Sequence, residues 1–126
     1  MPILTAIMYP PPDQEVLEKL KNSPLLVVSF GLYVIHLTFD NGNRLSLAAP
    51  FRFSSAETIG DAAIVEFPLR ESNMMRLLSH SVCDVRCDPD GSLELSFTNR
   101  DTLIVYSNDP MYETYTLLLD GQEYIV

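Results

Sequence analysis

Basic side chains are scarce in this sequence. Eight Lys and Arg stand against seventeen Asp and Glu, which gives a formal net charge of −9 at pH 7. Residues 61–126 hold four of the basic and twelve of the acidic side chains, so most of the excess lies there. An acidic surface repels phosphate backbones and anionic lipid, and we therefore expect neither a nucleic-acid nor a membrane partner. The charge suits a basic protein partner, or it serves solubility alone.

Long apolar segments are missing as well. The longest runs, such as residues 24–28, fall far short of the roughly 20 residues that a membrane-spanning helix needs. The N-terminus lacks the basic region and the apolar stretch of a secretory signal. We therefore expect a cytoplasmic protein.

Cysteine and glycine are few. Cys83 and Cys87 are the only cysteines, and with two histidines in the chain a four-ligand zinc site is not expected. In an extended segment their Cα atoms would lie ~13 Å apart, beyond the ~7 Å limit of a disulfide. The five glycines form no phosphate-cradling Gly-x-Gly-x-x-Gly run. We expect no metal and no cofactor.

Apolar residues are plentiful enough for one core. They make up 47% of the 126 residues, and aromatic residues make up 10%. This length is typical of one domain, so we expect a single domain over residues 1–126.

The first part of the chain predicts a helix followed by a meander. Residues 13–22 form the helix, with Asp13 as its N-cap. An apolar, β-branched run predicts a strand over residues 25–30, and alternating apolar and polar residues predict strands over residues 33–40 and 44–48. The Asn-Gly pair at 41–42 marks a hairpin, since both residues tolerate positive φ.

A similar pattern recurs 58 residues later. Residues 95–105 align with residues 37–47, with four of the eleven pairs identical. A second helix over about residues 72–79 and a strand over residues 82–87 precede this stretch. The pattern predicts an internal duplication of about residues 13–50 and 72–107. Arg100 stands where a second Asn-Gly or Asp-Gly turn would place glycine, which predicts a different loop there.

The other segments complete an α+β fold that is mostly antiparallel β. Residues 62–67 suggest a further strand. Residues 112–119 and 122–126 predict a C-terminal hairpin around Asp120-Gly121. The expected architecture is a duplicated three-stranded meander with two short helices and this hairpin. Whether the two meanders form one sheet or two stays open.

No catalytic constellation stands out, and we expect no catalytic residue. His36 and His80 are the available histidine bases, and neither belongs to a nucleophile motif. Asp109 and Glu113 could serve acid–base chemistry or bind a cation, although Asp109-Pro110 is also an ordinary turn initiator. The acidic run at residues 88–91 lacks the remaining ligands of a calcium loop and predicts a turn.

Tyrosines gather towards the C-terminus. Tyrosine is enriched where proteins recognise one another, and it is also a good strand former. The candidate interaction residues are Asp109, Tyr112, Glu113, Tyr115 and Tyr124.

Four segments together resemble a bacterial small-domain family of unknown function. They are the Phe-Gly-x-Tyr-x-x-x-Leu-x-Phe of residues 30–39, the Leu-x-Leu-x-Phe of residues 93–97, the Tyr-Glu-Thr-Tyr of residues 112–115 and the apolar residues 124–126. The likeness covers about residues 25–126. It implies the fold better than the function, and it suggests an immunity-like role.

Three functions stay open. We favour a non-catalytic protein-interaction module, such as an immunity-type protein that binds a basic partner. A self-associating structural subunit, for example a homodimer, would use an exposed sheet edge. A small hydrolase-like enzyme would use acidic residues near Glu113.

Overall fold

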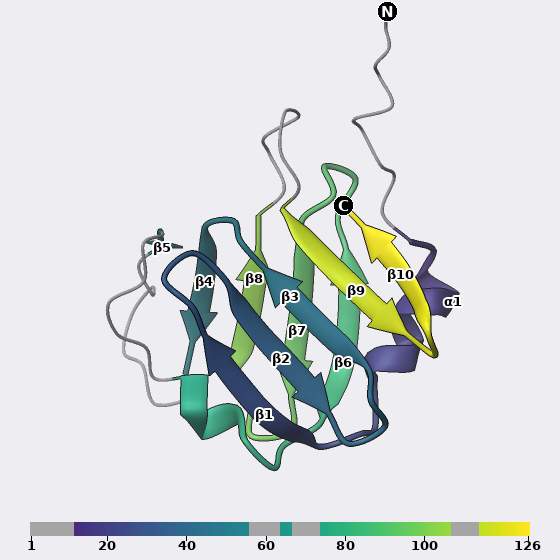
Figure 1. Cartoon of the computed structure of the whole chain (residues 1–126), viewed down its shortest axis with the longest axis horizontal. Helices are drawn as coiled ribbons and strands as arrows, with labels where there is room; N and C mark the ends of the chain where they lie inside the picture. Colours follow the sequence, from purple (N-terminus) through teal and green to yellow (C-terminus); the bar gives the residue numbers. More distant parts are fainter. Residues whose placement is uncertain (1–11, 56–63, 67–73, 107–113) are drawn as a thin grey trace, which may run out of the picture.

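The computed structural model describes residues 12–55, 64–66, 74–106 and 114–126 (Figure 1). Ten strands in these ranges form two five-stranded sheets, and every strand pairing is antiparallel. In order across the first sheet, the strands are β1 (Leu25–Phe30), β2 (Ile35–Phe39), β3 (Arg44–Leu47), β9 (Tyr115–Leu119) and β10 (Gln122–Ile125). Across the second sheet they are β5 (Ile64–Val65), β4 (Phe51–Ser54), β8 (Thr102–Val105), β7 (Leu93–Phe97) and β6 (Val82–Cys87).

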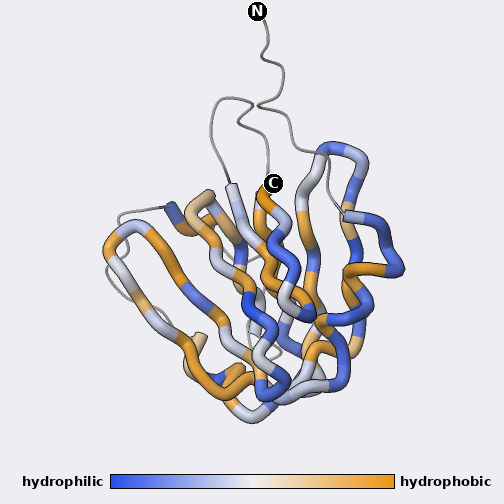
Figure 2. Tube along the Cα trace, turned by 45° about the vertical axis from the view of Figure 1, so that its right-hand side comes forward, coloured by the Kyte–Doolittle hydropathy of each residue, from blue (hydrophilic) through white to orange (hydrophobic). Residues whose placement is uncertain are grey.

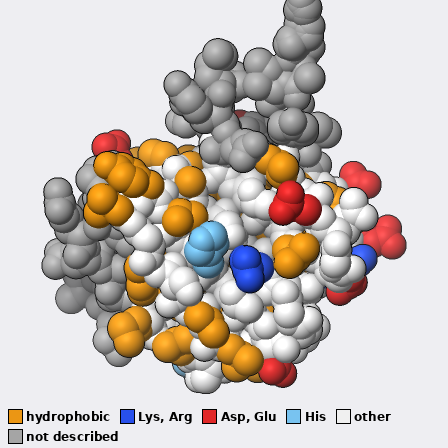
Figure 3. All heavy atoms as spheres, in the orientation of Figure 1, with side chains coloured by type: hydrophobic (Ala, Val, Ile, Leu, Met, Phe, Trp, Pro, Cys, Tyr) orange, Lys and Arg blue, Asp and Glu red, His pale blue; other side chains and the backbone are white. Residues whose placement is uncertain are grey.

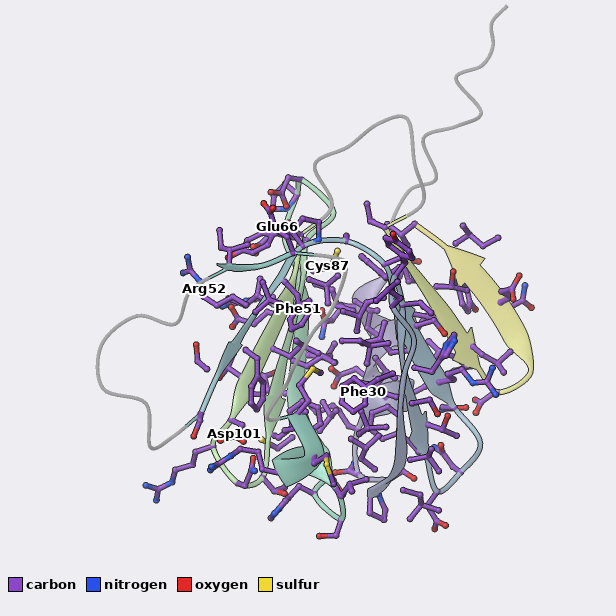
Figure 4. The ribbon with its side chains drawn as sticks, turned by 60° about the vertical axis from the view of Figure 1, so that its left-hand side comes forward. Phe30, Phe51, Arg52, Glu66, Cys87 and Asp101 are labelled. Carbon is purple, nitrogen blue, oxygen red and sulfur yellow. The ribbon has the colours of Figure 1, made fainter. Side chains whose placement is uncertain are left out.

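The two sheets pack face to face around one core (Figure 4). Hydrophobic and hydrophilic residues alternate along most strands (Figure 2), because successive side chains of a strand point to opposite faces. In β2, for example, Ile35, Leu37 and Phe39 are buried, whereas His36 and Thr38 are partly exposed. The expectation of a mostly antiparallel β fold is confirmed, and the open question is answered with two sheets.

Each sheet is completed by strands from the other half of the chain. After β3 the chain crosses to the second sheet, where β4 pairs with β8 and Phe51 lies opposite Val105. After β8 it crosses back, and β9 pairs with β3 so that Leu47 lies opposite Tyr115. Neither half of the sequence therefore builds a complete sheet alone.

The helices are shorter than the sequence predicted. The first is α1 (Gln14–Leu17), which continues into a 3-10 turn, Glu18–Leu20. The second is a single 3-10 turn, Met74–Leu77, and residues 72–73 lie outside the described ranges. Asp13 occupies the N-cap position, but its side chain makes no capping hydrogen bond. In the described part of the chain, no helix is long and apolar enough to cross a membrane.

The turn at Arg100 corrects an expectation. The N–H of Arg100 donates to the carbonyl of Phe97 at 2.9 Å, just as the N–H of Gly42 donates to Phe39 at 2.9 Å. Arg100 has φ of +73° and Gly42 has φ of +88°. The loop is therefore not different: it has the same shape as the first one, and the arginine adopts the left-handed backbone that favours glycine.

Arg100→Gly should raise the free energy of unfolding by about 0.5–1 kcal/mol, since a side chain in the left-handed region costs roughly 1–2 kcal/mol and the freer unfolded chain offsets part of this. Gly42→Ala is the matched opposite. It should lower the free energy of unfolding through the backbone alone, because an added Cβ there meets nothing within 4 Å. Urea denaturation measures both, and a destabilised Arg100→Gly protein would contradict the argument.

A buried carboxylate ties the same turn to the second short helix. Asp101 is fully buried, and its Oδ2 accepts hydrogen bonds from Arg76 Nε at 2.7 Å and from Asn99 Nδ2 at 3.0 Å. In the first half, buried Asn43 plays a similar part, since its Nδ2 donates to the carbonyl of Lys19 at 3.0 Å. Each short helix is thus held by a polar side chain that follows a β-turn.

Asp101→Ala should lower the free energy of unfolding by about 2–3 kcal/mol, because it removes a buried carboxylate that accepts charge-assisted and amide hydrogen bonds from the partly buried Arg76 and Asn99. The matched control is Glu94→Ala. Glu94 makes an equally short 2.7 Å ion pair with Arg86, but at the surface, where such a pair contributes about 0–1 kcal/mol. Chemical denaturation of both variants measures the difference, and equal losses would contradict this role for Asp101.

Candidate interaction surface

The candidate residues from the sequence have different fates in the structure. Asp109, Tyr112 and Glu113 lie outside the described residues. Tyr124 lies on β10, where it is half-buried and packs against the core. Tyr115 lies on β9 with only 2% of its surface exposed. Of the two candidates within the described residues, only Tyr124 keeps part of its side chain at the surface.

Tyr115 links the two sheets from inside. Its hydroxyl donates to the carbonyl of Gly91, in the turn between β6 and β7, at 2.8 Å, and it lies 3.8 Å from Cys87 Sγ. Burial, with a smaller effect from the neighbouring thiol, raises the pKa of Tyr115 far above its ordinary value. In this position the side chain stabilises the fold and offers no surface to a partner.

The stability of the protein should fall as the pH rises above about 10, because the unfolded state then loses the Tyr115 proton while the folded state keeps it. Below that pH the contribution is fully present. At neutral pH, Tyr115→Phe should lower the free energy of unfolding by about 1 kcal/mol, because the hydrogen bond is missing. In alkali, the free energy of unfolding of this variant should fall less steeply than that of the wild type. Urea denaturation from pH 7 to 10.5 tests this. Identical slopes of the free energy of unfolding against pH in the two proteins would contradict this expectation, since they share every other titrating group.

Exposed apolar side chains gather at one edge of the first sheet. Of the seven large hydrophobic side chains that stay exposed in the described residues, five lie on β1 or in the loop after it. We call these five the apolar strip: Leu26, Val27, Phe30, Leu32 and Tyr33. Figure 3 shows hydrophobic side chains over this side of the sheet, while most acidic side chains in view lie towards the right.

The apolar strip lies in a stretch without charge. Between Lys21 and Asp40 the sequence has no Asp, Glu, Lys or Arg. The edge strand β6 of the second sheet differs, because it carries Asp84 and Arg86, and Gln14 Nε2 donates to its Val85 carbonyl at 2.7 Å. Charges and covering groups are the usual protection of a sheet edge, and β1 has no charge of its own.

A shallow hollow of about 370 Å³, with polar and apolar lining residues, adjoins the strip on the outer face of the first sheet. His36 Nδ1 lies 2.6 Å from Ser46 Oγ within it. Such a pair could activate a nucleophile, and it lies on β2 and β3, two strands that pair with each other at His36 and Ser46. The hollow is lined by Val34, His36, Ser46, Ala48, Thr114, Tyr115, Thr116 and Glu123. Across the described ranges, no three side chains of the metal-ligating types lie together.

The comparison with protein families is decisive about membership. The model of a family of unknown function, DUF6188, matches residues 16–126. The chain belongs to this family. Both sheets, the apolar strip and the hollow lie within the matched residues, and the expectation of a family of unknown function is confirmed. No curated protein and no solved structure matches the chain.

Sequence reasoning missed the apolar strip. The apolar run of residues 25–30 predicted a strand, but such a run does not say whether the strand lies inside a sheet or at its edge. The useful signal was the eighteen-residue gap in charge between Lys21 and Asp40, in a chain that is otherwise strongly acidic. The number of charged residues in this stretch can be compared among members of the family.

Proposed function

We propose that the chain is a non-catalytic protein-interaction module whose contact surface is the apolar strip. The observation that supports this is the gathering of five exposed large hydrophobic residues on one uncharged edge strand and the loop after it. Contiguous apolar patches with a polar surround mark interaction sites. Phe30 and Tyr33 add aromatic rings, which are enriched at the centres of interfaces.

A narrower form of the proposal is an immunity-type protein that binds a basic partner. The net charge of −9 and the family resemblance support it. The acidic side chains outside the strip would then attract a positively charged protein and speed its association, while the strip itself would make the apolar contact. Binding that weakens steeply with added salt would agree with this form, and salt-independent binding would contradict it. The hydrolase-like alternative concerns Glu113, outside the described residues, and stays a prediction.

The internal duplication also stays a proposal, and two paired irregularities support it. The pairing of β1 with β2 shifts register between Leu25 and Val27. The pairing of β6 with β7 shifts between Val82 and Asp84, which is 57 residues further along the chain. A bulge repeated at the same place in two meanders is typical of a conserved feature.

A photo-crosslinking amino acid at Tyr33 tests the proposed surface in the native cells. We expect protein adducts from this position, because Tyr33 is 62% exposed within the strip. The matched control is the same amino acid at Gln122, an exposed residue on the opposite edge strand of the same sheet. Equal adduct yields at the two positions, or none at Tyr33, would contradict the proposal.

A further inference from the structure

We infer that the partner of the apolar strip is a second copy of this chain. The two β1 strands would pair antiparallel about a two-fold axis, and the two first sheets would join into one continuous sheet. This inference rests on the proposed function, since it names the partner of the same surface. It is argued from the main chain of β1, from its side chains and from its lack of charge.

The main chain of β1 presents hydrogen-bonding groups to its open side. The N–H of Phe39 in β2 bonds across the turn towards β3. Because main-chain groups alternate in direction along an antiparallel strand, Leu37 and Ile35 also bond to β3. Val28 lies opposite Leu37, and Phe30 lies opposite Ile35. Val28 and Phe30 therefore direct their N–H and C=O groups away from β2, to the side where the described residues place no strand.

The open stretch of β1 has a defined beginning. The N–H of Leu25 donates to the carbonyl of His80 at 2.9 Å, and the carbonyl of Leu25 accepts from Ser79 at 2.8 Å. This end of the strand is thus already paired on its outer side. Among the described residues, the outward main-chain groups of β1 that face no strand are those of Val28 and Phe30, with Ser29 between them.

The main-chain groups of Val28 and Phe30 can pair with the same groups of a second copy. A two-fold axis at Ser29 places Val28 of one copy opposite Phe30 of the other, and each then exchanges both main-chain hydrogen bonds with its partner. Isologous pairing of this kind is the commonest symmetry of soluble assemblies.

The side chains agree with this pairing. Phe30 lies at the rim between the two sheets (Figure 4) and is 43% exposed, while Val28 already packs against the core. In the joined sheet, Phe30 would cover Val28 of the second copy, so the apolar interior would continue across the junction. Aromatic and β-branched residues form stabilising cross-strand pairs.

Charge favours β1 as the junction between two copies. Two chains with a net charge of −9 repel each other, and the repulsion is weakest where neither surface carries charge. The eighteen residues between Lys21 and Asp40 meet that condition. Pairing of β6 with itself would instead bring Asp84 and Arg86 of the two copies to the junction and displace Gln14 from Val85.

Sedimentation of the full chain between about 1 and 100 μM tests the inference. We expect a dimer whose dissociation constant rises at least tenfold in Phe30→Lys, because a lysine in an edge strand opposes pairing. Gln122→Lys on the opposite edge should leave the dimer unchanged. Circular dichroism verifies that both variants are folded. A monomeric wild type, or a dimer that Phe30→Lys does not weaken, would overturn the inference.

A cysteine at Ser29 tests the register. The proposed axis brings the two Ser29 Cα atoms to about 4.5 Å, which suits a disulfide. Ser29→Cys, made in a Cys83→Ser background, should form a covalent dimer under mild oxidation, and Gln122→Cys should not. Absence of the Ser29→Cys dimer would overturn the pairing. If the chain is monomeric yet Tyr33 gives adducts with another protein, the inference fails and the proposed function stands; without adducts both fail.

Discussion

The pairing of β9 with β3, and of β4 with β8, holds this protein together. Through these two contacts, strands far apart in the sequence become neighbours, and each sheet gains its third and fourth strands from opposite halves of the chain. The buried residues on both sides then share one core. The Tyr115 hydroxyl adds a direct hydrogen bond from β9 to the turn of the opposite sheet. Without these two pairings, each half would be a three-stranded meander with one uncovered apolar face.

Local sequence patterns predicted the strands well and their arrangement only in part. The bounds 25–30 and 82–87 agree with β1 and β6, because strand-forming residues and the turn residues beside them are local signals. No local signal predicts that β4 pairs with β8 or that β9 pairs with β3. Phe51 and Tyr115 alternate with polar neighbours, and this pattern is compatible with pairing to any strand. The shape of the turn at Arg100 was also hidden, because main-chain hydrogen bonds fix it without glycine.

The candidate residues show a similar division. The choice of Tyr115 rested on amino-acid type, and type alone does not separate a contact surface from a core. The period of two in β9 does, because Tyr115, Leu117 and Leu119 are buried while Thr116 and Leu118 are not. In the sequence, the only sign of the apolar strip was its lack of charged residues. An uncharged stretch is informative because the rest of the chain is so acidic.

The exchange of strands also has a consequence for how the protein is made on the ribosome. Residues 25–47 emerge early, but β3 receives its second neighbour, β9, only when residues 115–119 have been synthesised. Until then the nascent chain holds an incomplete first sheet with a vacant side, and unpaired strand edges of this kind invite aggregation. Contacts between segments so distant in sequence also slow folding. The first sheet is thus completed only after residues 115–119 have left the ribosome, long after β1, β2 and β3.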